Sequence, residues 1–449
     1  MRQLHLNLFL HGRGHHEAAW RHPAASRLPL TDLGYYRQIA RKAEQGCLDS
    51  LFLADILTVF DETETSAIGG LEPLTLLGAL AASTTHIGLI ATASTTYTEP
   101  FNLARQFASL DHISGGRMGW NIVTSWTPGA ARNFGQRRQM AHADRYALAE
   151  EYVRVALALW DSWAADAVID NPASGRFSDR SRIRAIDHAG QHYDVAGPLN
   201  VPRSPQGRPV LVQAGSSATG KRFAARFAEA VFTAHMQKST AIEFCTELKA
   251  LAADEGRAPG QLVVMPGLSA TIGSTEEEAA RLNRELDEMT DPDVGRARLS
   301  DRFGGHNFAH LHLEKSLTVS DFPSPDQVQA ARSRTEAILG LVQRERPTLR
   351  RLLQILAGAR GHFCINGTPE HVADTIEDWF RDGAADGFNI MPPVLPTMLD
   401  AFIDQVVPIL QSRGLFRREY AETTLRGHYG LPTLPSRAFD THGPQAAVR

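Results

Sequence analysis

HIGLIATASTTYTEPFNLARQFASLDHISGGRMGWNIVTS, residues 86–125, contains a strand, a helix and a second strand in direct succession. The apolar run at 86–94 predicts the first strand. Pro100 is typical of the first turn of a helix, which we expect to end near His112. The turn residues SGG at 114–116 lead into a second strand at 117–125. Strands joined by a helical crossover run parallel, so this unit predicts a parallel sheet.

The alternation continues on both sides of this unit. Further strands are predicted at residues 4–10, 50–55, 209–215, 230–234, 261–273 and 387–392. Helices are predicted at 31–46, 72–84, 144–163, 217–228, 240–254, 368–380 and 397–412, and one from Ser274, with Thr31 and either Ser274 or Thr275 as N-caps. Eight parallel strands are the number that closes an α/β barrel. We therefore predict a (β/α)8 TIM barrel with insertions rather than an open doubly wound sheet.

The length does not require a second domain, because barrels with insertions pass about 400 residues as one unit. We expect residues 1–449 to form a single barrel domain, with insertions at about 165–208 and 290–360. The second insertion has a less regular pattern than the rest. After about residue 415, glycines and prolines predict an extended C-terminal arm.

The composition is that of an ordinary globular protein, with 43% hydrophobic residues and a formal net charge of -4. Such a balance gives no electrostatic reason to expect binding to nucleic acid or to a membrane. The opening segment MRQLHLNLFL lacks the long apolar run of a signal peptide, and no apolar window is long enough to span a bilayer, so we expect a cytoplasmic protein. Cys47, Cys245 and Cys364 are far apart and are predicted to be free thiols.

In a (β/α)8 barrel the active site lies at the carboxyl ends of the strands. There, QAGSSATG at 213–220 leads from a predicted strand into a helix, so its backbone N–H groups and hydroxyls can face an anion. An ordinary turn with Ser217 as the helix N-cap explains the segment equally well. His142 and Tyr146 are four residues apart and would project from one face of a helix. They also fit a capping histidine and a core tyrosine.

Histidines follow the first strand at positions 11, 15 and 16, where a metal hydrolase barrel would have ligands. No His-x-His lies at that strand end, and no partner ligands recur at later strand ends, so we predict no metal site. His310 and His312 lie in the second insertion. The sequence has no GxGxxG fingerprint, no P-loop and no GxSxG, which leaves dinucleotide-binding folds and a nucleophile elbow unsupported.

Several segments, taken in order, resemble the bacterial luciferase-like flavin monooxygenases. They are EPFNLARQFASLDHISGGRMGWNIVTSW (99–126), AARNFG (130–135), QAGSSATG (213–220) and GTPEHVADTIEDWFRDGAADGFNIMP (367–392). Within that superfamily the chain is similar to the nitrilotriacetate monooxygenase branch, which includes dibenzothiophene sulfone, EDTA and long-chain alkane monooxygenases. The resemblance extends from about residue 4 to 413 and implies a (β/α)8 barrel with FMN, used as FMNH2, at the mouth.

The resemblance assigns cofactor contacts residue by residue. Asp55 matches a flavin-contacting aspartate, Thr92 matches a threonine beside the isoalloxazine ring, and Asn121 faces the ring from the fourth strand.

At the other end of the flavin, His142 and Tyr146 match a pair that reaches the phosphate and ribityl region. Ser217 matches the serine of the phosphate-holding turn, which agrees with the helix N-terminus argument.

On the substrate side, HHEAAWRHP at 15–23 is typical of this branch, and His306 matches a segment that covers the pocket. The aspartate of that segment is Asn307 here. We name His16 and His306 as candidate catalytic residues, because a nearby histidine could set the protonation of the flavin C4a-(hydro)peroxide through which the family inserts oxygen. The predicted lid is 290–320, over an apolar mouth formed by Phe9, Phe60, Trp120, Trp126 and Phe388.

The resemblance therefore implies an FMNH2-dependent monooxygenase that takes one oxygen atom from O2 into a small organic substrate. Since no dinucleotide fold is visible, a separate NAD(P)H:flavin reductase would supply the FMNH2. A homodimer or a dimer of dimers is also implied. Two alternatives stay open, a deazaflavin-dependent hydride-transfer enzyme and a non-catalytic flavin-binding barrel. The substrate is open as well, because Arg13, Arg21 and Arg302 fit either a cationic or an apolar pocket.

Overall fold

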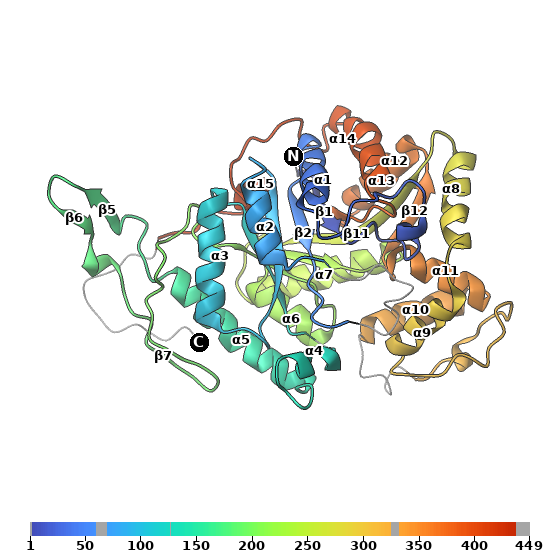
Figure 1. Ribbon diagram of the computed structural model, residues 1–449, viewed down its shortest axis with the longest axis horizontal. Coiled ribbons are helices and arrows are strands. Elements are labelled where there is room, and N and C mark those ends of the chain that lie inside the picture. The colour runs from blue at the N-terminus through green and yellow to red at the C-terminus, as the bar shows by residue number, and fades with distance from the viewer. Residues whose placement is uncertain (1, 60–69, 126, 325–331, 437–449) are drawn as a thin grey trace.

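The chain folds as a closed parallel barrel (Figure 1). The computed structural model describes residues 2–59, 70–125, 127–324 and 332–436. The barrel strands are β1 (His5–Leu10), β2 (Ser50–Leu53), β3 (Gly88–Ser94), β4 (Met118–Val123), β9 (Val210–Gln213), β10 (Ala230–Thr233), β11 (Val263–Ile272) and β13 (Gly387–Ile390). All eight pair in parallel, and the pairing of β10 with β11 closes the ring. The eight predicted strands and the predicted barrel are confirmed.

Helices cover the outside of this ring, as the alternation predicted (Figure 1). They are α1 (Leu33–Gln45), α2 (Pro73–Ala81), α3 (Pro100–Ser114), α5 (His142–Trp160), α6 (Ala218–Phe227), α7 (Lys238–Asp254), α8 (Glu276–Glu288), α12 (Pro369–Arg381), α13 (Thr397–Ala401) and α14 (Val407–Ser412). The short helix α4 (Pro128–Asn133), between β4 and α5, was not predicted. Thr275 caps α8, as one of the two predicted choices. Thr31 is not the cap of α1, because the side chain of Asp32 accepts the hydrogen bond from the Gly34 N–H.

A ninth strand, β12 (Phe363–Gly367), was not predicted. It pairs in parallel with the second half of β11, from Leu268 opposite Phe363 to Ile272 opposite Gly367. The first half of β11 pairs with β10 inside the barrel. β11 thus extends beyond the ring, and β12 lengthens the wall of the barrel on that side.

The first insertion consists mainly of two antiparallel hairpins that stand away from the barrel (Figure 1). One pairs β5 (Val168–Asn171) with β6 (Arg176–Ser178), and the other pairs β7 (His188–Ala189) with β8 (Asp194–Val195).

The second insertion is more regular than we expected. It contains α9 (Pro292–Arg302), α10 (Arg332–Glu345) and α11 (Leu349–Ala359). These helices share an apolar cluster of their own, which includes Leu299, Phe303, Phe308 and Leu352.

The arm after residue 415 is not simply extended, because it contains the short helix α15 (Leu425–His428). Leu425 is fully buried against the barrel strands, where Gly88 and Gly119 leave room for its side chain. The Tyr429 hydroxyl donates to Asn7 Oδ1 at 2.9 Å. The arm therefore closes the end of the barrel where the strands begin.

Candidate functional site

Thr92 and Asn121 lie opposite each other on the neighbouring strands β3 and β4, and both are buried. The Thr92 hydroxyl donates to the Leu53 carbonyl at 2.8 Å, so its oxygen is left to accept the Asn121 amide N–H at 2.9 Å. This chain of hydrogen bonds fixes the orientation of the amide and leaves Asn121 Oδ1 as an acceptor. Among the described residues this buried oxygen has no hydrogen-bond partner. The structure thus presents an unused acceptor near the carboxyl ends of the strands.

The QAGSSATG turn lies at the end of β9 and the start of α6. Ser217 is the N-cap of α6, and its Oγ accepts from the Gly220 N–H at 3.0 Å. The capping role that we considered is therefore present. Capping does not exclude an anion site, because the first N–H groups of a helix have no acceptor inside it.

Tyr146 lies directly against this turn. A Cβ placed on Gly215 would lie 2.9 Å from the Tyr146 hydroxyl oxygen and 2.3 Å from Gln213 Nε2. The absence of a side chain at position 215 therefore lets the Gln213 amide and the Tyr146 hydroxyl pack closely against the backbone of the turn. Burial raises the pKa of Tyr146, with hydrogen bonding to Ser217 and the charge of Arg145 acting in the opposite direction. Tyr146 therefore keeps its proton and can act as a donor.

His142 begins α5 on the solvent side of Tyr146, with the two ring centroids 4.9 Å apart. Burial and the neighbouring Arg145 lower the pKa of His142. The structure thus brings together three of the predicted cofactor residues, His142, Tyr146 and Ser217. Gln213 and Arg145 join them; each has a buried polar atom, Gln213 Oε1 and Arg145 Nε, with no partner among the described residues. The prediction did not include these two, although Gln213 opens the QAGSSATG segment.

Asp55 follows β2, one strand away from Thr92. Its side chain is half-buried, and burial together with the nearby carboxylate of Glu72 raises its pKa to about 6. A carboxyl group with this pKa exchanges protons close to neutral pH.

His16 and His306 do not line the pocket described below. His16 is buried; its Nδ1 accepts from the Ala18 N–H, and its Nε2 lies 3.7 Å from Asp287 Oδ1 on α8. His306 lies in the loop after α9, with its ring edge-on to Phe308 at 4.7 Å. Their catalytic roles stay predictions.

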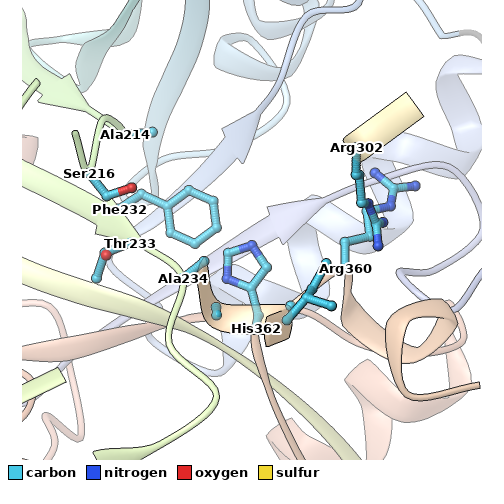
Figure 2. A pocket seen from close by; sticks show the side chains of 11 residues that line it. Ala214, Ser216, Phe232, Thr233, Ala234, Arg302, Arg360 and His362 are labelled. Atoms are coloured by element: carbon cyan, nitrogen blue, oxygen red, sulfur yellow. The ribbon is translucent and has the colours of Figure 1, made fainter. Parts of the chain in front are cut away.

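A small pocket opens between the ends of β9 and β10 and the second insertion (Figure 2). It is lined by Ala214, Ser216, Phe232, Thr233, Ala234, Arg302, Ala337, Ile338, Arg360, Gly361 and His362. The rings of Phe232 and His362 are stacked, with centroids 4.9 Å apart and planes 5° from parallel. Phe232 also packs edge-on against Phe9 and Phe52.

The aromatic prediction for this mouth is partly wrong. Trp120 and Phe388 pack outward, between the strands and the covering helices, where Trp120 meets Trp160 and Phe388 meets Trp379. Phe60 and Trp126 lie outside the described residues. Phe9 does belong to the inner aromatic group, and Phe52, Phe232 and His362 were missed.

The part of the chain that the structure describes contains no candidate metal site. No group of three or more His, Cys, Asp or Glu side chains there could hold a metal ion. The histidines after β1 make other contacts, since His15 Nε2 lies 2.7 Å from the Phe9 carbonyl oxygen and His11 Nε2 lies 2.6 Å from Arg360. In the same described ranges, every helix is too short or too polar to cross a membrane.

Known proteins match this chain over most of its length. Residues 9–386 match the family model described as luciferase-like monooxygenase. N-acetyl-S-(2-succino)cysteine monooxygenase of Bacillus subtilis (strain 168) is 46% identical over 96% of this chain and 97% of its own. Nitrilotriacetate monooxygenase component A of Aminobacter aminovorans is 43% identical, with the same two coverages.

A solved structure, EDTA monooxygenase from Chelativorans sp. BNC1, is 37% identical and superposes with a TM-score of 0.84, covering 96% of this chain and 99% of that one. More distant relatives carry other names. A dibenzothiophene-sulfone monooxygenase of Rhodococcus erythropolis (strain XP) is 39% identical, covering 96% of this chain and 97% of its own. A long-chain alkane monooxygenase of Geobacillus thermodenitrificans (strain NG80-2) is 33% identical, covering 96% of each.

Proposed function

Because this chain belongs to the luciferase-like monooxygenase family, we propose that it is an FMNH2-dependent monooxygenase that inserts one oxygen atom of O2 into a small organic substrate. A separate NAD(P)H:flavin reductase supplies the FMNH2. We also propose that the enzyme acts in the cytoplasm as a homodimer or a dimer of dimers. The observation that supports the proposal is the cradle at Gly215, where a glycine turn, the N-terminus of α6 and the Tyr146 hydroxyl meet.

The FMN phosphate would lie in this cradle. Ser217 and Tyr146 are hydrogen-bonded to each other, so the pair offers one further hydroxyl proton, and the N-terminus of α6 adds the N–H groups of its first turn. His142, whose ring lies 4.9 Å from that of Tyr146, would contact the phosphate or the ribityl chain. These groups suit a phosphate because they can donate hydrogen bonds to its oxygens, and because a helix N-terminus favours negative charge.

The flavin ring would lie over β3 and β4. Reduced flavin carries ring N–H groups, and the buried Asn121 Oδ1 is an acceptor that needs a donor. Thr92 holds the Asn121 amide in place, so its role is to position that acceptor. Asp55 would face the same ring from β2 and could hold or release a proton near neutral pH.

When bound, the reduced flavin supplies the chemistry that activates O2. The protein must hold the ring, exclude water from the reacting centre and orient the substrate. Phe232 and His362 form an aromatic wall for that space, and the second insertion covers it with Arg302, Ala337 and Ile338. His16 and His306 would act only if substrate binding brings them to the pocket.

The dependence on a reductase rests on two facts. The sequence lacks a dinucleotide-binding fingerprint, and one relative is named as component A of its monooxygenase. The names of the relatives do not choose a substrate, since nitrilotriacetate carries carboxylates whereas long-chain alkanes are apolar.

The proposal is tested by coupled turnover. The purified chain is mixed with FMN, NADH and O2, with and without a flavin reductase, across a panel of organic compounds. We expect substrate-dependent product and O2 uptake only when the reductase is present. Rapid NADH oxidation and product formation by the chain alone would contradict the two-component assignment. Turnover with a reduced deazaflavin and no O2 uptake would identify a hydride-transfer enzyme.

A further inference from the structure

The connection between β4 and α5 bridges the ends of other barrel strands, and we refer to residues 128–140 as the cover. It consists of α4 and the loop that leads from α4 to α5. Asn133 Nδ2 donates to the Leu57 carbonyl, in the segment after β2, at 2.8 Å. Gln139 Nε2 donates to the Ser125 carbonyl, just after β4, at 3.0 Å. The cover is therefore tied to the carboxyl ends of β2 and β4.

Tyr97, in the loop after β3, holds the part of the cover between these two ties. Its hydroxyl donates to Gln139 Oε1 at 2.8 Å. Its ring stacks on Phe134, with the ring centroids 4.8 Å apart and the planes 11° from parallel. Phe134 is exposed, so this stack lies at the surface and not in an apolar core. Because both contacts come from one side chain that belongs to the barrel, Tyr97 has the position of a latch.

The backbone where the cover leaves the barrel is strained. Up to Thr124 the end of β4 is bonded to the loop after β3, since Thr96 Oγ1 donates to the Thr124 carbonyl at 2.7 Å. At Ser125 the backbone has a φ of 44°, in the left-handed region that favours glycine. Ser125 is held there by the bond from Gln139 and by its own hydroxyl, which donates to Ser94 Oγ at 2.9 Å. Loss of the Gln139 bond would let this strain favour an open cover.

The flavin proposed above would lie beneath the cover. The proposed ring contacts Asp55, Thr92 and Asn121 lie on or directly after β2, β3 and β4, the three strands whose ends the cover bridges. The proposed phosphate contacts His142 and Tyr146 lie in the first turns of α5, into which the cover leads. A cofactor that a separate reductase supplies has to enter and leave this site in each catalytic cycle.

The outer surface of the cover is basic. Arg132, Arg137 and Arg138 are exposed, and no acidic residue occurs from position 127 to position 143. The phosphate of a flavin mononucleotide is negatively charged. A surface of one sign raises the rate at which a ligand of the opposite sign arrives. The charge of the cover thus favours the approach of flavin from this side of the mouth.

We propose that the cover is the gate through which reduced flavin enters and oxidised flavin leaves, and that Tyr97 is its latch. This inference rests on the proposed monooxygenase function and names the device that regulates its cofactor exchange. A gate limits arrival and departure alike, because both need the open state. A residue that only contacts the bound flavin changes mainly the rate of departure. The two roles therefore differ in the rate constants that they alter.

The test measures both rate constants without turnover. Photoreduced FMN is mixed anaerobically with the chain in a stopped-flow instrument, and its release is followed with an excess of another flavin-binding protein as a trap. We expect Tyr97→Ala and Gln139→Ala to raise the association and dissociation rate constants together, each about fivefold or more, while Kd changes by less than about threefold. Gln136→Ala is the matched control, because Gln136 lies in the same segment but Tyr97 donates to Gln139.

Hydrogen exchange tests the latch without flavin. The amides of residues 134–140 should exchange faster in Tyr97→Ala than in the wild type, while those of β3 and β4 stay protected. Tyr97→Phe keeps the ring that stacks on Phe134 and loses the bond to Gln139, so its exchange should lie between the two. Thermal unfolding of each variant shows that it is folded.

The outcomes separate this inference from the proposed function. If Tyr97→Ala and Gln139→Ala raise only the dissociation rate constant, these residues contact the flavin and the gate is wrong. If neither rate constant changes, the flavin uses another path, and the gate is wrong while the monooxygenase survives. If the wild type binds no FMNH2, the monooxygenase assignment fails, and hydrogen exchange alone decides whether Tyr97 holds the cover.

Discussion

At the scale of single residues, the proposed flavin site depends on a few hydroxyl and amide groups whose positions are set by their neighbours. Ser217 is held by the Gly220 N–H, and Asn121 is held by Thr92, which is itself held by the Leu53 carbonyl. Tyr146 is held differently, by packing edge-on against Phe223 at 5.7 Å. Each polar group thus has its own support before any ligand arrives.

Tyr146→Phe should weaken FMNH2 binding, because it removes a hydroxyl donor beside the phosphate cradle. The loss of such a hydrogen bond to a charged group is worth about 1–3 kcal/mol, which corresponds to a roughly 5- to 150-fold higher Kd. Ser217→Ala should act in the same direction. Anaerobic titration of the variants with FMNH2 measures the change, with Tyr193→Phe as a control that lies against Tyr152. If both variants bind FMNH2 as tightly as the wild type, the phosphate does not bind at this turn.

Asp55 should make stability depend on pH. Burial and Glu72 raise the pKa of Asp55 from 3.8 to about 6, so the folded state binds this proton more tightly than the unfolded state. The stabilisation of the folded state by this proton is therefore fully present below about pH 4 and is lost as the pH rises through about 6. Asp55→Asn should match the wild type at pH 4 and exceed its free energy of unfolding by about 1–2 kcal/mol at pH 7.5. Denaturant titrations across this pH range measure the difference in the free energy of unfolding between Asp55→Asn and the wild type. A difference that does not change with pH would contradict the prediction.

At the scale of helices and strands, the barrel could be predicted because each strand is a short apolar run between helical stretches. Because most positions in such a run are apolar, the sequence does not show which side chains point into the barrel. A parallel strand in a barrel is buried on both faces, so its apolar residues do not alternate with polar ones. Trp120 and Phe388 were assigned to the mouth for this reason, although both belong to the layer under the helices.

Elements whose partners lie far away in the sequence could not be predicted. β12 is five residues long, its first four positions alternate between half-buried and exposed, and its only pairing is with β11, about a hundred residues earlier. The turn at 213–220 could be predicted because a strand end, glycine, serines and a helix start are adjacent in the sequence. Arg360 was not visible, because only the fold brings it to His11, from which it is 349 residues distant in the chain.

The second insertion should open more readily than the barrel, because it has an apolar cluster separate from the main core. Leu299→Ala removes a fully buried side chain from α9 and should cost about 2–4 kcal/mol. We expect hydrogen exchange to increase in α9, α10 and α11 while β1–β4 stay protected. Leu251→Ala, at a half-buried position on α7, should leave exchange in these helices unchanged. Equal loss of protection in the barrel strands would show that the insertion is not a separate unit.

At the scale of the whole molecule, the C-terminal arm is fastened to the base of the barrel by buried ion pairs. Arg426 binds Glu229 with two nitrogens, at 2.7 and 2.9 Å, and Arg208 adds a third contact at 3.3 Å. Burial opposes the charge on Glu229, but Arg208 and Arg426 outweigh it and lower the pKa of Glu229. Arg417 similarly pairs with the buried Asp49, which also lies 3.2 Å from His5.

Leu425→Ala should therefore destabilise the whole barrel, since Leu425 fills the space over Gly88 and Gly119. We expect a loss of about 2–4 kcal/mol in the free energy of unfolding. Arg426→Gln should cost a similar amount, because it leaves Glu229 buried with less compensating charge. Chemical denaturation measures both, and Leu431→Ala at the edge of the same group should cost less. If Leu425→Ala and Arg426→Gln each lower the free energy of unfolding by less than about 1 kcal/mol, the arm contributes little to the stability of the barrel.

The order of synthesis gives this fastening a further consequence. Tyr429 binds Asn7 across 422 positions of the chain, and Leu425 fits between strands that the ribosome has made about three hundred residues earlier. During translation, β1–β4 therefore leave the ribosome before Leu425 has been made, and the apolar space that this side chain fills at their base stays exposed. The nascent chain stays in that state until the segment around Leu425 emerges, and such unfinished barrels expose surface that aggregates. We expect this protein to depend on chaperones that hold a growing chain more than on those that act after release.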